Sequence, residues 1–168
     1  MLSIAVIIAN RNNAQFLPQC LDSVFSQTLR PADVRSGSIK PIFNEIPLGV
    51  SASRHKAIEQ SVSEYITTLD ADDFYQSSQK LAEEARVIAE SSGVRRIAFS
   101  DVVSVDTRGK SLSLVSSRRR IREGDLSFFI RHLSGFIPRD YLVARADYLA
   151  AGGFNSSLRL YEDWDLKI

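Results

Sequence analysis

Apolar and polar positions alternate along the first hundred residues in blocks that predict strands and helices in turn. The block 4–9 is apolar throughout and rich in β-branched residues, as is typical of a strand buried on both faces of a parallel sheet. The polar run 10–13 then supplies residues that favour turns and helix starts. Apolar residues recur at three-and-four spacing over 16–25, which predicts an amphipathic helix.

The same reading continues downstream, although residues 30–45 contain several Pro and Gly and predict a loop with one short strand near Ile39, Ile42 and Phe43. The alternation predicts an α/β fold with a doubly wound, mostly parallel sheet flanked by helices and a small antiparallel element. Ligands of such sheets bind beyond the carboxyl ends of the strands. The remaining expected elements are helices over 48–62, 77–91, 125–133 and 147–151 and strands over 64–69, 97–105, 111–115 and 141–144.

Composition indicates one ordinary globular domain. The chain has 168 residues, of which 44% are hydrophobic and 24% charged, and a formal net charge of +1. A charge so near zero gives no reason to expect nucleic acid as a partner. The single cysteine, Cys20, fits a reducing compartment. No basic region precedes the apolar block 4–9, which is too short to span a membrane, so we expect a cytoplasmic protein; attachment to a membrane-bound enzyme complex stays open.

The densest acidic cluster directly follows the expected strand 64–69. In an extended segment, Asp70 and Asp72 would project to the same side, about 6.8 Å apart along the chain, with Asp73 beside them. Carboxylate oxygens suit Mg²⁺ or Mn²⁺, which commonly combine one or two carboxylates with substrate phosphates. The alternative is that Asp72 or Asp73 simply caps the next helix, or that these carboxylates are merely exposed at the surface.

Two further groups of residues have both a functional and an ordinary structural interpretation. Glu162 and Asp163 form a second acidic pair, which suits a general base or the first turn of a helix. Arg54, on the expected helix 48–62, is either a solvated helix residue or a contact to a diphosphate or base. His55 and His132 lack the spacing of metal ligands, so we expect structural or surface roles for them.

Four segments in a fixed order resemble the family 2 glycosyltransferases of the GT-A fold. They cover most of the chain and include an Asp-x-Asp motif followed, near the end, by an acidic motif. The resembling segments are residues 4–28, 44–54, 64–73 and 152–166. The resemblance implies one domain over 1–168, with a nucleotide-binding part at about 1–106 and an acceptor-side part at about 107–168.

The resemblance also implies a donor and a metal. The donor is a nucleotide-diphospho-sugar, commonly a UDP-sugar, held together with Mn²⁺ or Mg²⁺. Asp72 would bind the metal that bridges the diphosphate, Asp70 would lie near the metal and the ribose or donor sugar, and Asp73 would support them. The metal would act as a Lewis acid on the leaving diphosphate.

The remaining implied roles concern catalysis and the nucleotide. Asp163, with Glu162 next to it, would deprotonate the acceptor hydroxyl for an in-line attack that inverts the sugar carbon. Asn10 and Arg11 would lie near the nucleotide, and Arg54 near its base or phosphates. The acceptor would be a saccharide, a lipid-linked molecule or a protein, in polysaccharide or cell-envelope synthesis, and homo-oligomerisation stays open.

Two departures from the family pattern keep other functions open. Residues 32–43 lack the Asp-containing run that touches the nucleotide base, and the chain stops at Ile168, five residues after Asp163. We therefore expect either a fragment truncated on the acceptor side or a degenerate domain that binds a nucleotide or a partner without catalysis. A nucleotidylyltransferase would also place acidic metal ligands on a similar fold, but it would need a Gly-rich loop and lysine that the N-terminus lacks.

Overall fold

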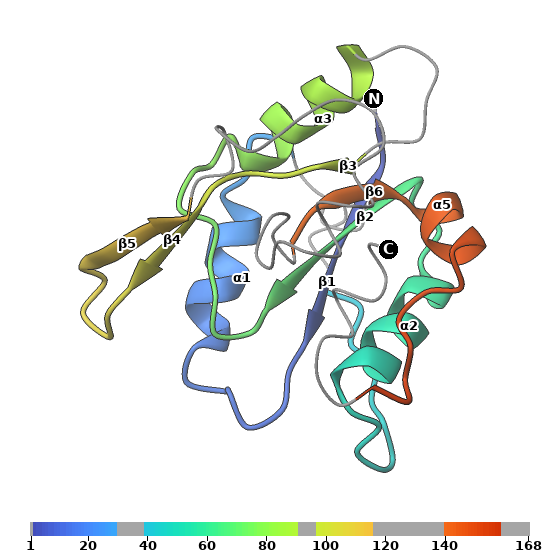
Figure 1. Cartoon of the computed structure of the whole chain (residues 1–168). Helices are drawn as coiled ribbons and strands as arrows, with labels where there is room; N and C mark the ends of the chain where they lie inside the picture. The colour runs from blue at the N-terminus through green and yellow to red at the C-terminus, as the bar shows by residue number, and fades with distance from the viewer. Residues whose placement is uncertain (1, 30–38, 91–96, 116–139, 159–168) are drawn as a thin grey trace.

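The computed structural model describes residues 2–29, 39–90, 97–115 and 140–158 (Figure 1). Over the first hundred residues helices lie between successive strands, as the sequence predicted, although α2 follows α1 with no strand between them in the described residues. The elements are β1 Ile4–Ala9, α1 Leu17–Phe25, α2 Val50–Gln60, β2 Tyr65–Asp70, α3 Lys80–Glu90, β3 Ile97–Ala98, β4 Val102–Val105, β5 Ser111–Val115, β6 Leu142–Ala144 and α5 Arg145–Ala150. In the described part of the chain, no helix is long and apolar enough to cross a membrane.

The main sheet has four strands in the order β1-β2-β6-β3. Strands β1 and β2 pair in parallel, whereas β6 is antiparallel to both of its neighbours, β2 and β3. Three strands therefore run in one direction and β6 runs in the opposite one. The predicted α/β class with helices flanking the sheet is confirmed, and the sheet is mixed, with one parallel and two antiparallel strand pairs. The predicted small antiparallel element is the separate hairpin of β4 and β5.

Three expected elements need correction or lie outside the described residues. The strand predicted over 97–105 is two strands in two sheets, because the polar pair Ser100–Asp101 interrupts it and the Ser100 hydroxyl turns to donate to Glu84 Oε1 (2.8 Å). Residues 39–49 contain no strand, so the described part of that loop lacks the one predicted there. The helix predicted over 125–133 lies outside the described residues.

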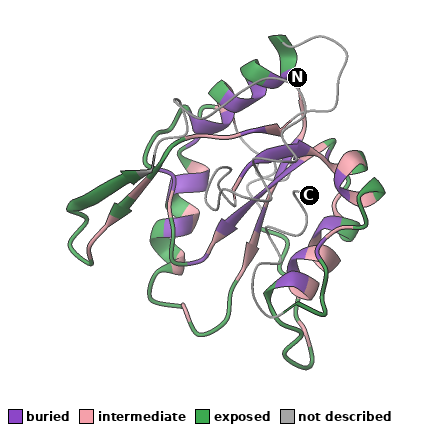
Figure 2. Cartoon of the chain, viewed as in Figure 1, coloured by how far each residue is buried: buried purple, intermediate pink, exposed green. Residues whose placement is uncertain are grey.

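Helices cover both faces of the sheet, so β1 is buried on both sides. Alternate β1 residues enter different clusters: Ala5 and Ile7 pack with α2 and α5 residues, whereas Val6 and Ile8 pack with α1 and α3 residues. The buried positions of the helices accordingly face the sheet (Figure 2). Arg145 ties α5 to α2 by donating to the carbonyl of Ile58 at 2.8 Å.

The register of the parallel pair fixes where a site can form. Ala9, the last residue of β1, is paired with Asp70, the last residue of β2. The loops that follow the two strands therefore leave the sheet at the same edge. This is the edge at which open α/β sheets bind their ligands.

Candidate functional site

The acidic cluster forms a turn at the carboxyl end of β2. The backbone N–H of Asp73 donates to the Asp70 carbonyl at 3.0 Å, so the chain turns directly after β2 instead of continuing in the extended geometry that the sequence analysis assumed. Asp72 and Asp73 are exposed. Helix α3 begins only at Lys80, so the alternative in which Asp72 or Asp73 caps this helix is wrong. The exposed carboxylates are thus available to a ligand at the sheet edge.

Asp70 is joined to α2 by an ion pair. The Arg54 guanidinium donates from Nη2 to Asp70 Oδ1. The Arg54 side chain is only 3% exposed, so the solvated-helix interpretation of this arginine is wrong. Its guanidinium carbon also lies 5.9 Å from the centre of the Phe154 ring, within the range of a cation–π contact. A buried positive charge therefore stands behind the acidic turn.

The loop after β1 brings two more predicted residues to this edge. Asn10 and Arg11 are exposed and directly follow Ala9, the register partner of Asp70. Asn12 adopts a left-handed backbone with φ of 62°, which asparagine tolerates better than most residues. The structure therefore brings Asn10, Arg11 and the acidic turn to neighbouring strand ends.

The pKa of the Cys20 thiol is raised by burial and by the negative charge of the turn. This α1 side chain is fully buried, and its Sγ donates to the Asp70 carbonyl at 3.5 Å. Burial, followed by the charges of Asp73, Asp70 and Asp72, raises the pKa of Cys20 to about 11. The three carboxylates therefore act together on one buried group, and they concentrate a negative potential that favours a cation.

The donor set suits a metal that is shared with a ligand. Among the described residues, no three His, Cys, Asp or Glu side chains converge on one point as a complete protein cage would require. Mg²⁺ and similar ions instead use one or two carboxylates together with phosphate oxygens and water. The exposed carboxylates of Asp72 and Asp73 fit that mode.

A second network, which the sequence analysis missed, holds Phe154 against the Arg54 guanidinium. The Tyr148 hydroxyl accepts from the Phe154 N–H at 3.1 Å and lies 3.0 Å from His55 Nδ1. Gly153 has a φ of 70°, and a Cβ there would lie only 2.4 Å from His55 Nδ1. The expectation of a structural role for His55 is thus supported. The network seats Phe154 against Arg54, and only the Gly-Gly-Phe run could have indicated it from sequence.

The second acidic motif is not part of the described site. Glu162 and Asp163 lie outside the described residues, so the predicted general base is not placed by the structure. The geometry therefore brings Asn10, Arg11 and the acidic turn to one sheet edge, with Arg54 behind them.

Comparison with protein families identifies the class to which this fold and site belong. The profile of Glycosyl transferase family 2 matches residues 29–143, which is more than half of the chain. The chain belongs to this family of glycosyltransferases. The matched residues include Arg54 and the acidic turn but not Asn10, Arg11 or the second acidic motif. A comparison with curated proteins gave no match.

Solved structures share the fold at low sequence identity. The chain is similar to S. aureus TarS 1-349, with a TM-score of 0.62 and 16% identity over 97% of this chain and 53% of that one. The same fragment in complex with UDP-GlcNAc gives a TM-score of 0.66 and 16% identity over 97% and 51% of the two chains. This chain therefore spans about half the length of the TarS fragments that it matches.

Proposed function

We propose that this domain binds a UDP-sugar with Mn²⁺ or Mg²⁺ and transfers the sugar, with inversion, to an acceptor hydroxyl. One observation carries the proposal. In a family 2 chain, two exposed carboxylates follow β2 at the carboxyl edge of the parallel strands, and the adjacent Asp70 is held by a buried arginine. The fold shared with a TarS fragment solved with UDP-GlcNAc supports a uridine donor.

Each residue of the edge has a proposed task. Asp72 holds the divalent cation, with Asp73 and Asp70 beside it. A bound cation would supply Lewis-acid stabilisation of the leaving diphosphate. Arg54 fixes Asp70 so that its carboxylate is presented to the cation, the ribose or the donor sugar, and its charge attracts the diphosphate. Because a preorganised charge does not have to reorient during the reaction, a buried and packed arginine is well suited to this task.

The loop after β1 and the second acidic motif complete the proposal. Asn10 and Arg11 contact the nucleotide from the neighbouring strand end. Asp163, with Glu162 beside it in sequence, takes the proton of the acceptor hydroxyl as that oxygen attacks the sugar carbon. The acceptor is a saccharide, a lipid-linked molecule or a protein, and polysaccharide or cell-envelope assembly is the process proposed for it.

Calorimetric titration of UDP into the 168-residue chain, with Mn²⁺ and then with chelator, tests the proposal. We expect binding that requires Mn²⁺ and is lost in Asp72→Asn. Asp22→Asn is the matched control, because Asp22 is an exposed α1 residue that lies outside the acidic turn. Equal binding by wild type and Asp72→Asn, or no binding by wild type, would contradict the proposal and favour a non-catalytic domain.

A further inference from the structure

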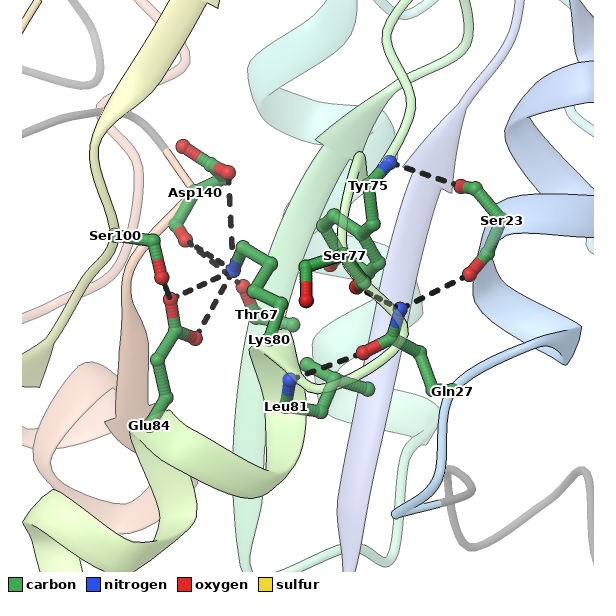
Figure 3. Close-up of polar contacts among 10 residues, drawn as sticks. All are labelled: Ser23, Gln27, Thr67, Tyr75, Ser77, Lys80, Leu81, Glu84, Ser100 and Asp140. Carbon is green, nitrogen blue, oxygen red and sulfur yellow. Dashed lines mark hydrogen bonds and ion pairs between the residues drawn. The ribbon is translucent and has the colours of Figure 1, made fainter.

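The segment between the acidic turn and α3 is held by a side chain that follows the end of α1. Gln27 lies just after α1, is only 2% exposed, and bonds this segment in both directions (Figure 3). Its Nε2 donates to the Ser77 carbonyl at 2.8 Å and its Oε1 accepts from the Leu81 N–H at 3.0 Å. Leu81 is the second residue of α3, and its N–H has no partner within the helix. Gln27 therefore caps α3 from a distance of 54 residues in sequence.

Other α1-side contacts hold the same segment at further points. The buried Ser23 hydroxyl accepts from the Tyr75 N–H at 3.0 Å (Figure 3). It also donates to the Cys20 carbonyl of its own helix at 2.7 Å. Thr28 donates its backbone N–H to the Ser78 carbonyl at 2.8 Å. Together with the Cys20 thiol on the Asp70 carbonyl, these contacts fasten the path from β2 to α3 along one side.

The acidic turn is therefore fixed at both of its ends. At the β2 end, Asp70 is held by the sheet register and by Arg54. At the α3 end, Gln27 and Ser23 hold the backbone, while Asp72 and Asp73 between these anchors are exposed. Buried backbone groups that lose their partners open locally more often, so losing one anchor frees the exposed part of the turn.

We propose that Gln27 is a positioning residue that holds the acidic turn in the one geometry that binds a divalent cation with a nucleoside diphosphate. The inference rests on the proposed function. Gln27 touches neither the cation nor the nucleotide; it acts through the backbone of Ser77 and Leu81. Its amide is suited to the task because it donates to a carbonyl and accepts from an N–H at the same time.

The test compares Gln27→Met with Ser26→Ala. Gln27→Met keeps the length of the side chain but removes its bonds to Ser77 and Leu81, together with the bond from Nε2 to the Ser23 carbonyl at 3.1 Å. Ser26 is an exposed neighbour whose hydroxyl donates to the Ser23 carbonyl and to no residue of the segment that follows the turn. Amide hydrogen exchange is measured over residues 70–81 and over β1, and UDP is titrated with Mn²⁺ well below the melting temperature. For Gln27→Met we expect about tenfold faster exchange in 70–81 and about tenfold weaker UDP binding, with β1 unchanged.

The outcomes separate this inference from the proposed function. Wild-type exchange over 70–81 in Gln27→Met overturns the inference, and so does faster exchange with unchanged UDP affinity, because a merely structural anchor would lower stability without moving affinity. If wild type itself does not bind UDP, the proposed function fails, and the exchange measurement alone decides whether Gln27 orders the turn. If Gln27→Met does not fold, Ser23→Ala is judged by the same two measurements; it removes the acceptor for the Tyr75 N–H and the bond that the Ser23 hydroxyl donates to the Cys20 carbonyl.

Discussion

Replacing Gly153 with alanine should destabilise the domain through a collision that the structure locates. Gly153 has a φ of 70°, and an added Cβ would lie 2.4 Å from His55 Nδ1, 2.6 Å from His55 Cε1 and 3.0 Å from the Tyr148 hydroxyl. The left-handed backbone costs an alanine about 1–2 kcal/mol. Because His55 must rotate away, its bond to Tyr148 is also lost, at about 0.5–1.5 kcal/mol. We expect a total loss of roughly 1.5–3.5 kcal/mol and a fall in Tm of roughly 3–14 °C for a chain of this size.

The neighbouring glycine provides the control. Gly152 has a φ of 88°, but a Cβ there meets nothing within 4 Å, so Gly152→Ala should cost only the backbone term of about 1–2 kcal/mol. Both variants are measured by chemical denaturation, and Gly153→Ala is repeated in a His55→Ala background. There the collision with His55 is absent and only the 3.0 Å approach to the Tyr148 hydroxyl remains, so the cost should fall towards that of Gly152→Ala. Equal costs for the two glycines, or an undiminished cost in the His55→Ala background, would refute the reasoning.

Three further predictions concern the buried ion pairs and the buried thiol. Asp70→Ala should cost about 3–5 kcal/mol because it breaks the ion pair of a buried guanidinium, whereas the exposed Asp72→Ala should stay within about 0.5 kcal/mol; similar losses in chemical denaturation would contradict this. Lys80→Met should cost about 3–5 kcal/mol at pH 7, because it leaves the buried Glu84 without its cation. Burial raises the pKa of Glu84, and the charge of Lys80 partly offsets this. Without Lys80, a charged Glu84 lowers the free energy of unfolding above the folded pKa of this carboxyl, and the loss disappears as pH falls through that value. The loss of stability in Lys80→Met should therefore shrink on acidification, and a loss that does not change with pH would contradict this. Since burial and the nearby carboxylates raise the pKa of Cys20 to about 11, its alkylation by iodoacetamide should stay slow at pH 8 and accelerate only towards pH 11; fast reaction at pH 8 would contradict this.

Most of the fold could be predicted because its signals are local. A strand buried on both faces must be apolar throughout, so the block that became β1 was recognisable on its own. The direction of β6 could not be predicted in this way, because strand order and direction depend on pairs that are distant in sequence. Strand β6 pairs with β2 across more than seventy residues. The break between β3 and β4 also depends on a long-range contact, from Ser100 to the buried Glu84.

The candidate site divides in the same way. The strand-end rule placed Asp70 and Asp72 at the carboxyl edge of the sheet from sequence alone, whereas Asn10 and Arg11 were expected near the nucleotide only from the family resemblance. A lone helical arginine looks the same whether it is solvated or buried, so sequence could not show that Arg54 pairs with Asp70. Nor could it show that Gln27 caps α3, since an amide caps a distant helix only after the chain has folded.

The central claim is a UDP and cation site at the carboxyl edge of β1 and β2. Diffraction at the manganese absorption edge, from crystals grown with UDP and Mn²⁺, tests it most directly. We predict one manganese peak between the Asp72 carboxylate and the diphosphate, with the nucleotide beside Asn10 and Arg11. A manganese ion or a nucleotide bound away from the turn at Asp70–Asp73 would contradict it.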